Sequence, residues 1–270
     1  MNLSVRPAAV AGMFYPESSI VLAREVERLL AEASPRTMAQ RPKAIIAPHA
    51  GYVYSGPVAA SLYAPLVALR GSISRVVLLG PTHRVAIDGL ALPDCRAFAT
   101  PLGIVPIDQL AVAAIADLPQ VVVSEAAHAQ EHSLEVQLPF LQAVLGDFSL
   151  LPLAVGDASP QAVAQVLERL WGDDETLIVV SSDLSHYLPY AQARRIDAQT
   201  AQAIVTLDTA IDHRQACGAT PINGLLLAAR AHGLHGQLLD LRNSGDTAGD
   251  KARVVGYGAF AFGEEKSNVH

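Results

Sequence analysis

Short, continuous runs of apolar residues recur along this 270-residue chain and constrain its fold more than any other feature. A strand whose residues are all apolar has both faces covered, which is typical of a parallel sheet with helices on both sides. We therefore predict that these runs are buried strands. They lie at residues 44–47, 76–79, 121–123, 150–153 and 177–180.

Segments with helical periodicity separate the predicted strands. Residues 18–33 place apolar side chains at helical spacing, and a Ser-Pro pair predicts a helix over 160–171. The pair Thr220-Pro221 repeats this signal, with Thr220 as the expected N-cap of a helix over 222–232. The alternation of strands and helices predicts an α/β fold with a largely parallel sheet.

A later segment predicts a mixed rather than a purely parallel sheet. Prolines and glycines interrupt short apolar runs over residues 89–107, which indicates irregular or edge β structure. Residues 254–262 have the composition of a last strand. Since we find no linker, internal repeat or low-complexity tract, we predict a single domain over residues 1–270.

Composition narrows the classes of function. The chain has 51% hydrophobic and 17% charged residues, enough to bury a large core, and its net charge of −7 does not favour nucleic-acid binding. Cys95 and Cys217 cannot build a disulfide framework. We expect no signal peptide and no membrane span, because no run reaches about 18 uninterrupted apolar residues. A cytoplasmic protein is predicted.

Histidines follow the ends of three predicted strands. His49 comes after residues 44–47, His83 after 76–79 and His186 after 177–180. Ligand sites in open α/β sheets lie beyond the carboxyl ends of the strands, so these side chains can converge. Imidazole suits zinc, copper, iron and nickel. A single loop histidine is more often structural, but the three shared positions predict a non-haem metal site.

A second group of histidines forms the pattern H-x-x-E-H, the inverted zinc-peptidase motif, with His128, Glu131 and His132. That motif requires His128 and Glu131 to lie within one helix. The apolar spacing that follows predicts a helix beginning near residue 132 instead. We interpret Glu131 as an acidic residue at a helix N-terminus, and we expect His132 to point into the pocket.

Other candidate residues carry weaker signals. Cys217 precedes the helix predicted over 222–232, where its thiol is either activated by a lowered pKa or buried and inert. Asp246 lies in a turn after a late strand and offers a carboxylate, with Asp240 and Asp250 as alternatives.

Several blocks of sequence, in order along nearly the whole chain, resemble the Memo family, also called AmmeMemoRadiSam system protein B. They are residues 10–16 (VAGMFYP), 47–56 (APHAGYVYSG), 79–83 (LGPTH), 131–141 (EHSLEVQLPFL), 181–186 (SSDLSH) and Cys217-Gly218. That family is similar in fold to the class III extradiol, LigB-type dioxygenases. The resemblance implies a three-layer α/β/α sandwich with a mixed, largely parallel sheet.

The resemblance also implies roles for individual residues. His49 and His83 would hold the metal, with iron(II) expected and copper or zinc as alternatives. His186 would be the acid/base residue, with Asp183 beside it. The residues that we add to the pocket are Tyr54, His132, Cys217 and Asp246.

One position departs from the related proteins. The dioxygenases have a glutamate as third metal ligand and animal Memo proteins have a cysteine, but Leu241 occupies that position here. Leucine cannot ligate a metal, so Asp240 or Asp246 would have to complete a facial triad.

Two functions follow from these expectations. The first is an iron-dependent, dioxygenase-like oxidoreductase that acts on a small, catechol-like molecule, with His186 moving a proton. The second is a non-catalytic protein that uses the same crevice to bind a metal, a peptide or an anion. Retention of His186 favours the first, and the missing third ligand favours the second.

Overall fold

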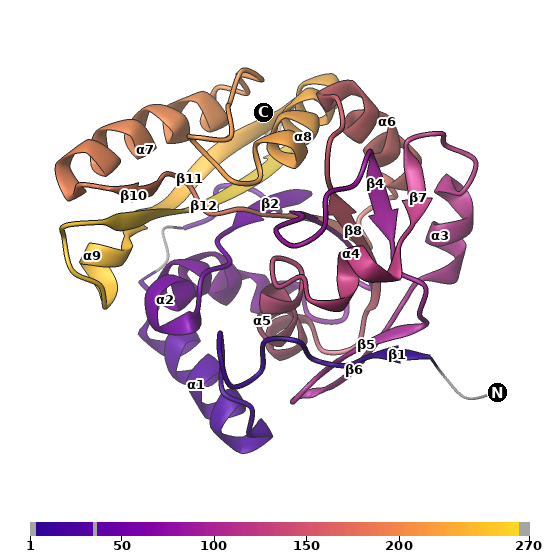
Figure 1. Ribbon diagram of the computed structural model, residues 1–270, viewed down its shortest axis with the longest axis horizontal. Coiled ribbons are helices and arrows are strands. Elements are labelled where there is room, and N and C mark those ends of the chain that lie inside the picture. Colours follow the sequence, from indigo (N-terminus) through magenta and orange to yellow (C-terminus); the bar gives the residue numbers. More distant parts are fainter. Residues whose placement is uncertain (1–3, 35–36, 265–270) are drawn as a thin grey trace, which may run out of the picture.

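The computed structural model describes residues 4–34 and 37–264 (Figure 1). Each of the five apolar runs forms a strand of one nine-stranded sheet. The strands of this sheet are β2 (Ala44–Ala47), β3 (Arg75–Pro81), β4 (Leu90–Leu92), β7 (Val121–Val123), β8 (Ser149–Val155), β9 (Thr176–Ser181), β10 (His186–Leu188), β11 (Leu234–Asn243) and β12 (Val254–Glu264).

The sheet is mixed and largely parallel, as predicted. Its order is β10-β12-β2-β9-β3-β8-β4-β7, with β11 paired along β12. The central strands β2, β9, β3 and β8 are parallel, whereas β12 runs antiparallel to β2, and β4 antiparallel to β8. Most of residues 89–107, where prolines and glycines interrupt the apolar runs, lies outside this sheet. It supplies β5 (Ala97–Thr100) and β6 (Gly103–Pro106) to a small sheet with β1 (Val5–Arg6).

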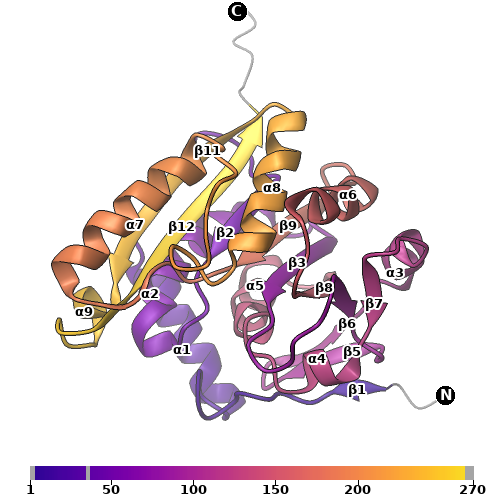
Figure 2. The ribbon, with the colours of Figure 1, turned by 45° about the horizontal axis from the view of Figure 1, so that its top comes forward.

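Helices cover both faces of the main sheet. One face carries α1 (Ser19–Glu32), α2 (Tyr52–Tyr63) and α5 (Leu138–Leu145), and the other carries α3 (Gln109–Ile115), α6 (Pro160–Leu170), α7 (Tyr190–Val205) and α8 (Ala219–Ala231). Successive residues of a strand point to opposite faces, so Ile45 joins the first hydrophobic cluster and Ile46 the second. Figure 1 shows α7 and α8 above β11 and β12, and α1 and α2 below them. In Figure 2, where the top of that view is turned forward, α7 and α8 lie nearer the viewer than α1 and α2. This is the α/β/α layering expected.

The shorter helices lie in connecting segments. They are η1 (Ala64–Leu69), α4 (Glu125–Ala129), η2 (Glu135–Gln137) and α9 (Ser244–Thr247). Helix α6 is capped as predicted, since the Ser159 side chain accepts from the backbone N–H of Ala162. The predicted cap of α8 is wrong. Gly218 is its N-cap, and Thr220 lies within the first turn, where Pro221 removes no helical hydrogen bond.

The segment Tyr52–Leu69 has the length and apolar composition of a membrane span, yet 56% of it is buried inside the fold. It contains α2 and η1, and α2 contacts α1, β11 and β12. A Cβ atom at Gly56 would lie 2.9 Å from Leu29 Cδ1, so the glycine permits the close approach of α2 to α1. We therefore interpret α2 as a core helix, which begins three residues after His49.

Candidate metal centre

Neighbouring parallel strands bring the predicted histidines to one edge of the sheet. β9 lies between β2 and β3. His49 is two residues beyond the end of β2, and His83 is two residues beyond the end of β3. His186 follows β9 after a short loop and begins β10. Parallel strands end on the same side, which explains why these distant residues lie near each other.

Three imidazoles form a compact group, but the third is His132 rather than His186. The possible ligand nitrogens of His49, His83 and His132 all lie within 4.8 Å of one another. The ring centroids are 5.2 Å apart for His49 and His83, and 4.5 Å apart for His83 and His132. Such a group could hold a metal ion.

His132 reaches this group from a loop. Helix α4 contains His128 and ends at Ala129, so Glu131 and His132 lie beyond it. The helix predicted to begin near residue 132 is wrong, because η2 begins only at Glu135. The H-x-x-E-H residues therefore do not share a helix face, as the peptidase motif requires. His128 is buried away from the three-histidine group, with its Nε2 atom 2.8 Å from the carbonyl oxygen of Ala91.

Glu131 is the buried acceptor that organises the loop. Its Oε1 atom accepts from His83 Nδ1 and from the backbone N–H groups of His132 and Ser133, each at 2.9 Å, and its Oε2 accepts from the His83 backbone. Burial alone would raise the pKa of Glu131, but the hydrogen bonds and charge of His83, with the Ser133 N–H, lower it to about 2. The expected role of Glu131 at a helix N-terminus is wrong. It orients His83.

The hydrogen bonds define which nitrogen of two rings carries the lone pair. Ser181 Oγ donates to the carbonyl of Ser133, so it accepts from His49 Nδ1 at 2.9 Å. His83 Nδ1 likewise donates to ionised Glu131. In the neutral form, each ring then carries its lone pair on Nε2, the form in which imidazole binds metals.

Burial favours the neutral form of the His49 and His132 rings. Desolvation holds the pKa of His49 well below its usual value, and the charges of His132, His83 and His186 add to this effect. Desolvation also lowers the pKa of His132 to about 4, although the Glu131 carboxylate opposes it. Metal ions compete with protons for imidazole nitrogens, so a low pKa favours metal binding near neutral pH.

Asp183 and His186 lie next to the three-histidine group. Asp183 Oδ1 accepts from the backbone N–H of His49 at 2.7 Å. Burial raises the Asp183 pKa to about 6, while the N–H groups of His49 and Ala50 and the charge of His186 oppose the shift. His186 Nδ1 donates to the Leu184 carbonyl at 2.8 Å, which leaves its Nε2 as the basic atom.

Cys217 also contacts the candidate centre. Its Sγ atom is 3.4 Å from Nε2 of His49. Burial and the nearby Asp183 raise the pKa of the thiol to about 12. Of the two alternatives considered from the sequence, the activated thiol is therefore wrong, and the buried, inert thiol is the one that the structure supports. A helix N-terminus does not offset the loss of water around a thiolate that is buried beside a carboxylate.

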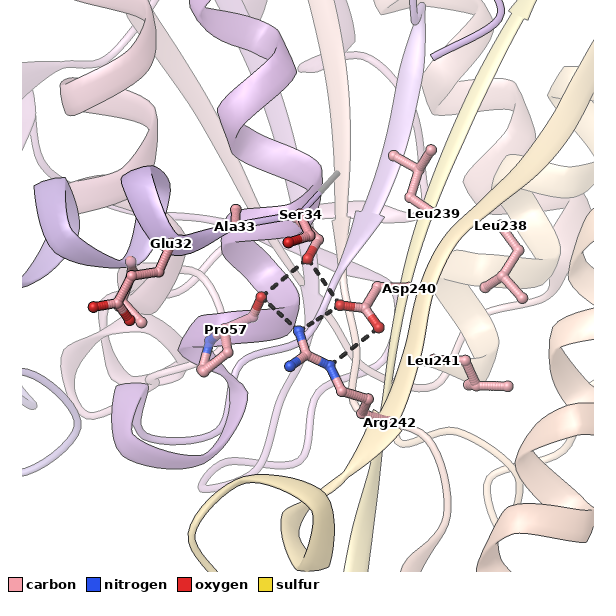
Figure 3. Close-up of a pocket in the computed structure, with 11 residues that line it drawn as sticks. Glu32, Ala33, Ser34, Pro57, Leu238, Leu239, Asp240, Leu241 and Arg242 are labelled. Carbon is pink, nitrogen blue, oxygen red and sulfur yellow. Dashed lines mark hydrogen bonds and ion pairs between the residues drawn. The ribbon is translucent and has the colours of Figure 1, made fainter. Parts of the chain in front are cut away.

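The carboxylates considered as a third ligand have other partners. Asp240 pairs with Arg242 and accepts from Ser61 in a cavity of about 490 Å³ between α1, α2 and β11 (Figure 3). Asp246 caps α9 by accepting from the Asn243 backbone. Neither belongs to the three-histidine group.

The side chains of Leu241 and Tyr54 also have clear environments. Leu241 packs against the second hydrophobic cluster, while Tyr54 is half-exposed at the start of α2. His132 was expected in the pocket from the sequence, but not as a member of the group that could hold a metal.

The fold and site together define an α/β protein with a candidate histidine centre at the strand ends. The family model described as "Memo-like protein" matches residues 6–261, and the chain belongs to this family. It is 37% identical to a MEMO1 family protein of Methanopyrus kandleri, with 95% of this chain and 98% of the relative covered. It is also 37% identical to a MEMO1 family protein of Aquifex aeolicus, over 96% of this chain and 100% of the relative.

A solved structure shares the fold. The crystal structure of an uncharacterized protein from Escherichia coli K12 matches with a TM-score of 0.50 and 14% sequence identity. The match covers 81% of this chain and 98% of that one. At this identity the likeness concerns the fold alone.

Proposed function

We propose that this protein is a non-haem metal enzyme, a dioxygenase-like oxidoreductase that holds iron(II) on His49, His83 and His132 and acts on a small molecule. The observation that carries the proposal is the convergence of the three imidazoles. The donor set fits iron, copper or zinc, whereas magnesium and calcium prefer oxygen ligands. His132 replaces the carboxylate that we sought near Leu241.

The bound metal would supply the chemistry of dioxygen and of an oxygen-bearing substrate. Protein groups supply access and proton transfer. His83 is the most exposed of the three rings, with 29% of its side chain accessible, so substrate would enter from its side. His186 offers its Nε2 atom to accept a substrate proton, because its Nδ1 atom donates to the Leu184 carbonyl.

Metal analysis of protein purified without added metal, and without a metal-binding tag, tests the first half of this proposal. We expect one iron per chain, with copper or zinc as alternatives. Asp240→Ala and Asp246→Ala are matched controls, because each removes a carboxylate outside the three-histidine group. Both should retain the metal.

Oxygen uptake with a panel of catechols tests the second half. The proposal predicts uptake by the wild type and a large loss in His186→Ala. Tight metal binding without uptake on any substrate would favour the alternative function, a non-catalytic protein that binds a peptide or an anion in this crevice.

We place the protein in the cytoplasm, which is supported by two free cysteines.

A further inference from the structure

Tyr187 has a backbone conformation that residues with side chains rarely adopt. Its φ is 58°, and among the described residues only Leu207 is another non-glycine with positive φ. Tyr187 lies between His186 and Leu188, where the pairing of β10 with β12 shifts register. A bulge residue in this left-handed conformation is usually glycine.

Packing does not explain why a tyrosine occupies this position. The residue is 62% exposed, so burial of the ring offers little to offset the backbone strain. Strain of this kind is found at sites where the side chain serves a function. The ring is held at the surface next to His186, with 5.8 Å between the ring centroids.

An arginine lies beside Tyr187 at the surface. We call Tyr187, this arginine (Arg253) and Arg84 the rim of the candidate centre. The guanidinium of Arg253 lies over the Tyr187 ring, 5.2 Å from its centroid. Arg253 has no carboxylate partner within residues 4–34 and 37–264, and neither does Arg84, which follows His83 directly. Two guanidinium groups with no carboxylate partner among the described residues therefore flank the histidines of a chain whose net charge is −7.

The rim is connected to the candidate metal centre. His186 lies three residues after Asp183, whose Oδ1 atom accepts from the backbone N–H of His49 at 2.7 Å. Arg84 follows His83, whose ring centroid lies 4.5 Å from that of His132. A ligand held on Tyr187 would thus be adjacent to His186 and near the centre.

We propose that Tyr187 and Arg253 form a clamp that selects single-ring aromatic anions as ligands of this site. The tyrosine presents a flat surface for an aromatic ring, and the guanidinium supplies donors for a carboxylate. The inference rests on the proposed function for the position of the site, but not on the identity of the metal. The strain at Tyr187 is the feature that the clamp accounts for.

Three probes separate the parts of the clamp. They are para-hydroxybenzoate, phenol, which lacks the charge, and cyclohexanecarboxylate, which lacks the aromatic face. Equilibrium dialysis should show that the wild-type protein binds para-hydroxybenzoate about tenfold more tightly than either of the others. None of the probes chelates a metal. Chelator-treated protein should bind the three probes with the same order of affinities, so the clamp can be tested even if the protein holds no iron.

Variants at the two positions should affect different probes. Arg253→Ala should weaken the binding of para-hydroxybenzoate about tenfold and leave the affinity for phenol within about twofold of the wild type. Tyr187→Ala should weaken the binding of both aromatic probes about fivefold. Tyr187→Phe should keep the wild-type affinities, because the ring rather than the hydroxyl makes the contact. Arg214→Ala is the control for charge, since that exposed side chain pairs with Asp212. It should change no affinity.

Stability provides a second readout that separates strain from ligand binding. Tyr187→Gly should melt about 2–4 °C above Tyr187→Ala, because only glycine relieves the left-handed conformation, while both lose affinity equally. No binding of para-hydroxybenzoate to the wild type, or equal binding by wild type and Arg253→Ala, would overturn the proposal. Equal melting temperatures of the Gly and Ala variants would remove its basis in strain.

Discussion

Nδ1 of His83 donates a hydrogen bond to the buried Oε1 atom of Glu131 at 2.9 Å. The same carboxylate accepts from the backbone N–H of His132. Two of the three imidazoles in the candidate centre therefore depend on one side chain for their position. A carboxylate that holds a histidine ligand in this way fixes its tautomer and strengthens its binding to metal.

Replacement of Glu131 should accordingly weaken metal binding without removing a ligand. We expect Glu131→Ala to reduce the affinity about 10–100-fold, the usual effect of losing such a partner, and Glu131→Gln to retain more of it. Calorimetric titration with iron(II) under anaerobic conditions would measure both. Glu125→Ala is a suitable control, because Glu125 lies nearby on α4 and is exposed. Unchanged affinity in Glu131→Ala would show that the carboxylate has no part in the centre.

His128 should contribute to stability but not to metal binding. His128→Ala leaves the buried carbonyl of Ala91 without its partner, which should cost about 1–3 kcal/mol in the free energy of unfolding. Its metal affinity should stay within about twofold of the wild type. Denaturant unfolding and metal titration of one variant check both statements. If His128→Ala lost the metal while His49→Ala kept it, the wrong group of histidines would have been chosen.

The buried ion pair of Arg6 and Glu135 should be essential for stability. Arg6 also donates to the carbonyls of His128 and Glu131, so it fastens the N-terminal segment to the loop of the candidate centre. Arg6→Ala leaves a buried charge unpaired, which should cost about 3–5 kcal/mol. Urea unfolding would measure the loss.

The control for this experiment is Arg28→Ala, which removes exposed ion pairs with Glu25 and Glu32. Exposed pairs contribute little, so its effect should stay below about 1 kcal/mol. In the Arg6→Ala background, Glu135→Gln should recover part of the stability, because the neutral amide is less costly to bury. A loss in Arg6→Ala no larger than that in Arg28→Ala would contradict this account.

Asp197 should make the protein less stable as the pH rises. Burial raises its pKa from 3.8 to about 6, although the Ser185 N–H opposes this. The folded chain therefore binds its proton more tightly than the unfolded chain. Its unfavourable contribution is absent below about pH 4, grows between about pH 4 and 6, and reaches on the order of 3 kcal/mol above that range.

Asp197→Asn removes this titration while keeping an oxygen that can accept from Ser185. The difference in unfolding free energy between variant and wild type should grow in favour of the variant from pH 4.5 to pH 7.5. Urea unfolding at several pH values would measure it. Parallel profiles would show that Asp197 titrates alike in the folded and unfolded chains.

The sequence predicted the sheet and two members of the candidate centre for a physical reason. Strands such as residues 44–47 and 76–79 are apolar throughout, and the residues after them must lie at the same edge of a parallel sheet. The positions of His49 and His83 follow from that rule. The roles of these residues as metal ligands stay predictions.

The third member could not be placed by the same rule. His132 follows no strand, because a loop between α4 and η2 carries it to the centre. Its position depends on the long-range contacts of Glu131 with His83, which local sequence patterns do not encode. The search for a carboxylate near Leu241 failed for a related reason, since Asp240 has a local partner, Arg242, that only the structure reveals.

We propose that His49, His83 and His132 hold one metal ion and that His186 does not. Metal titration of His132→Ala and His186→Ala, compared with wild type, tests it most directly. We predict that the wild type binds one metal per chain, that His132→Ala binds more than about 100-fold more weakly, and that His186→Ala binds as the wild type does. Full affinity in His132→Ala together with loss of the metal in His186→Ala would show that His186, not His132, is the third ligand.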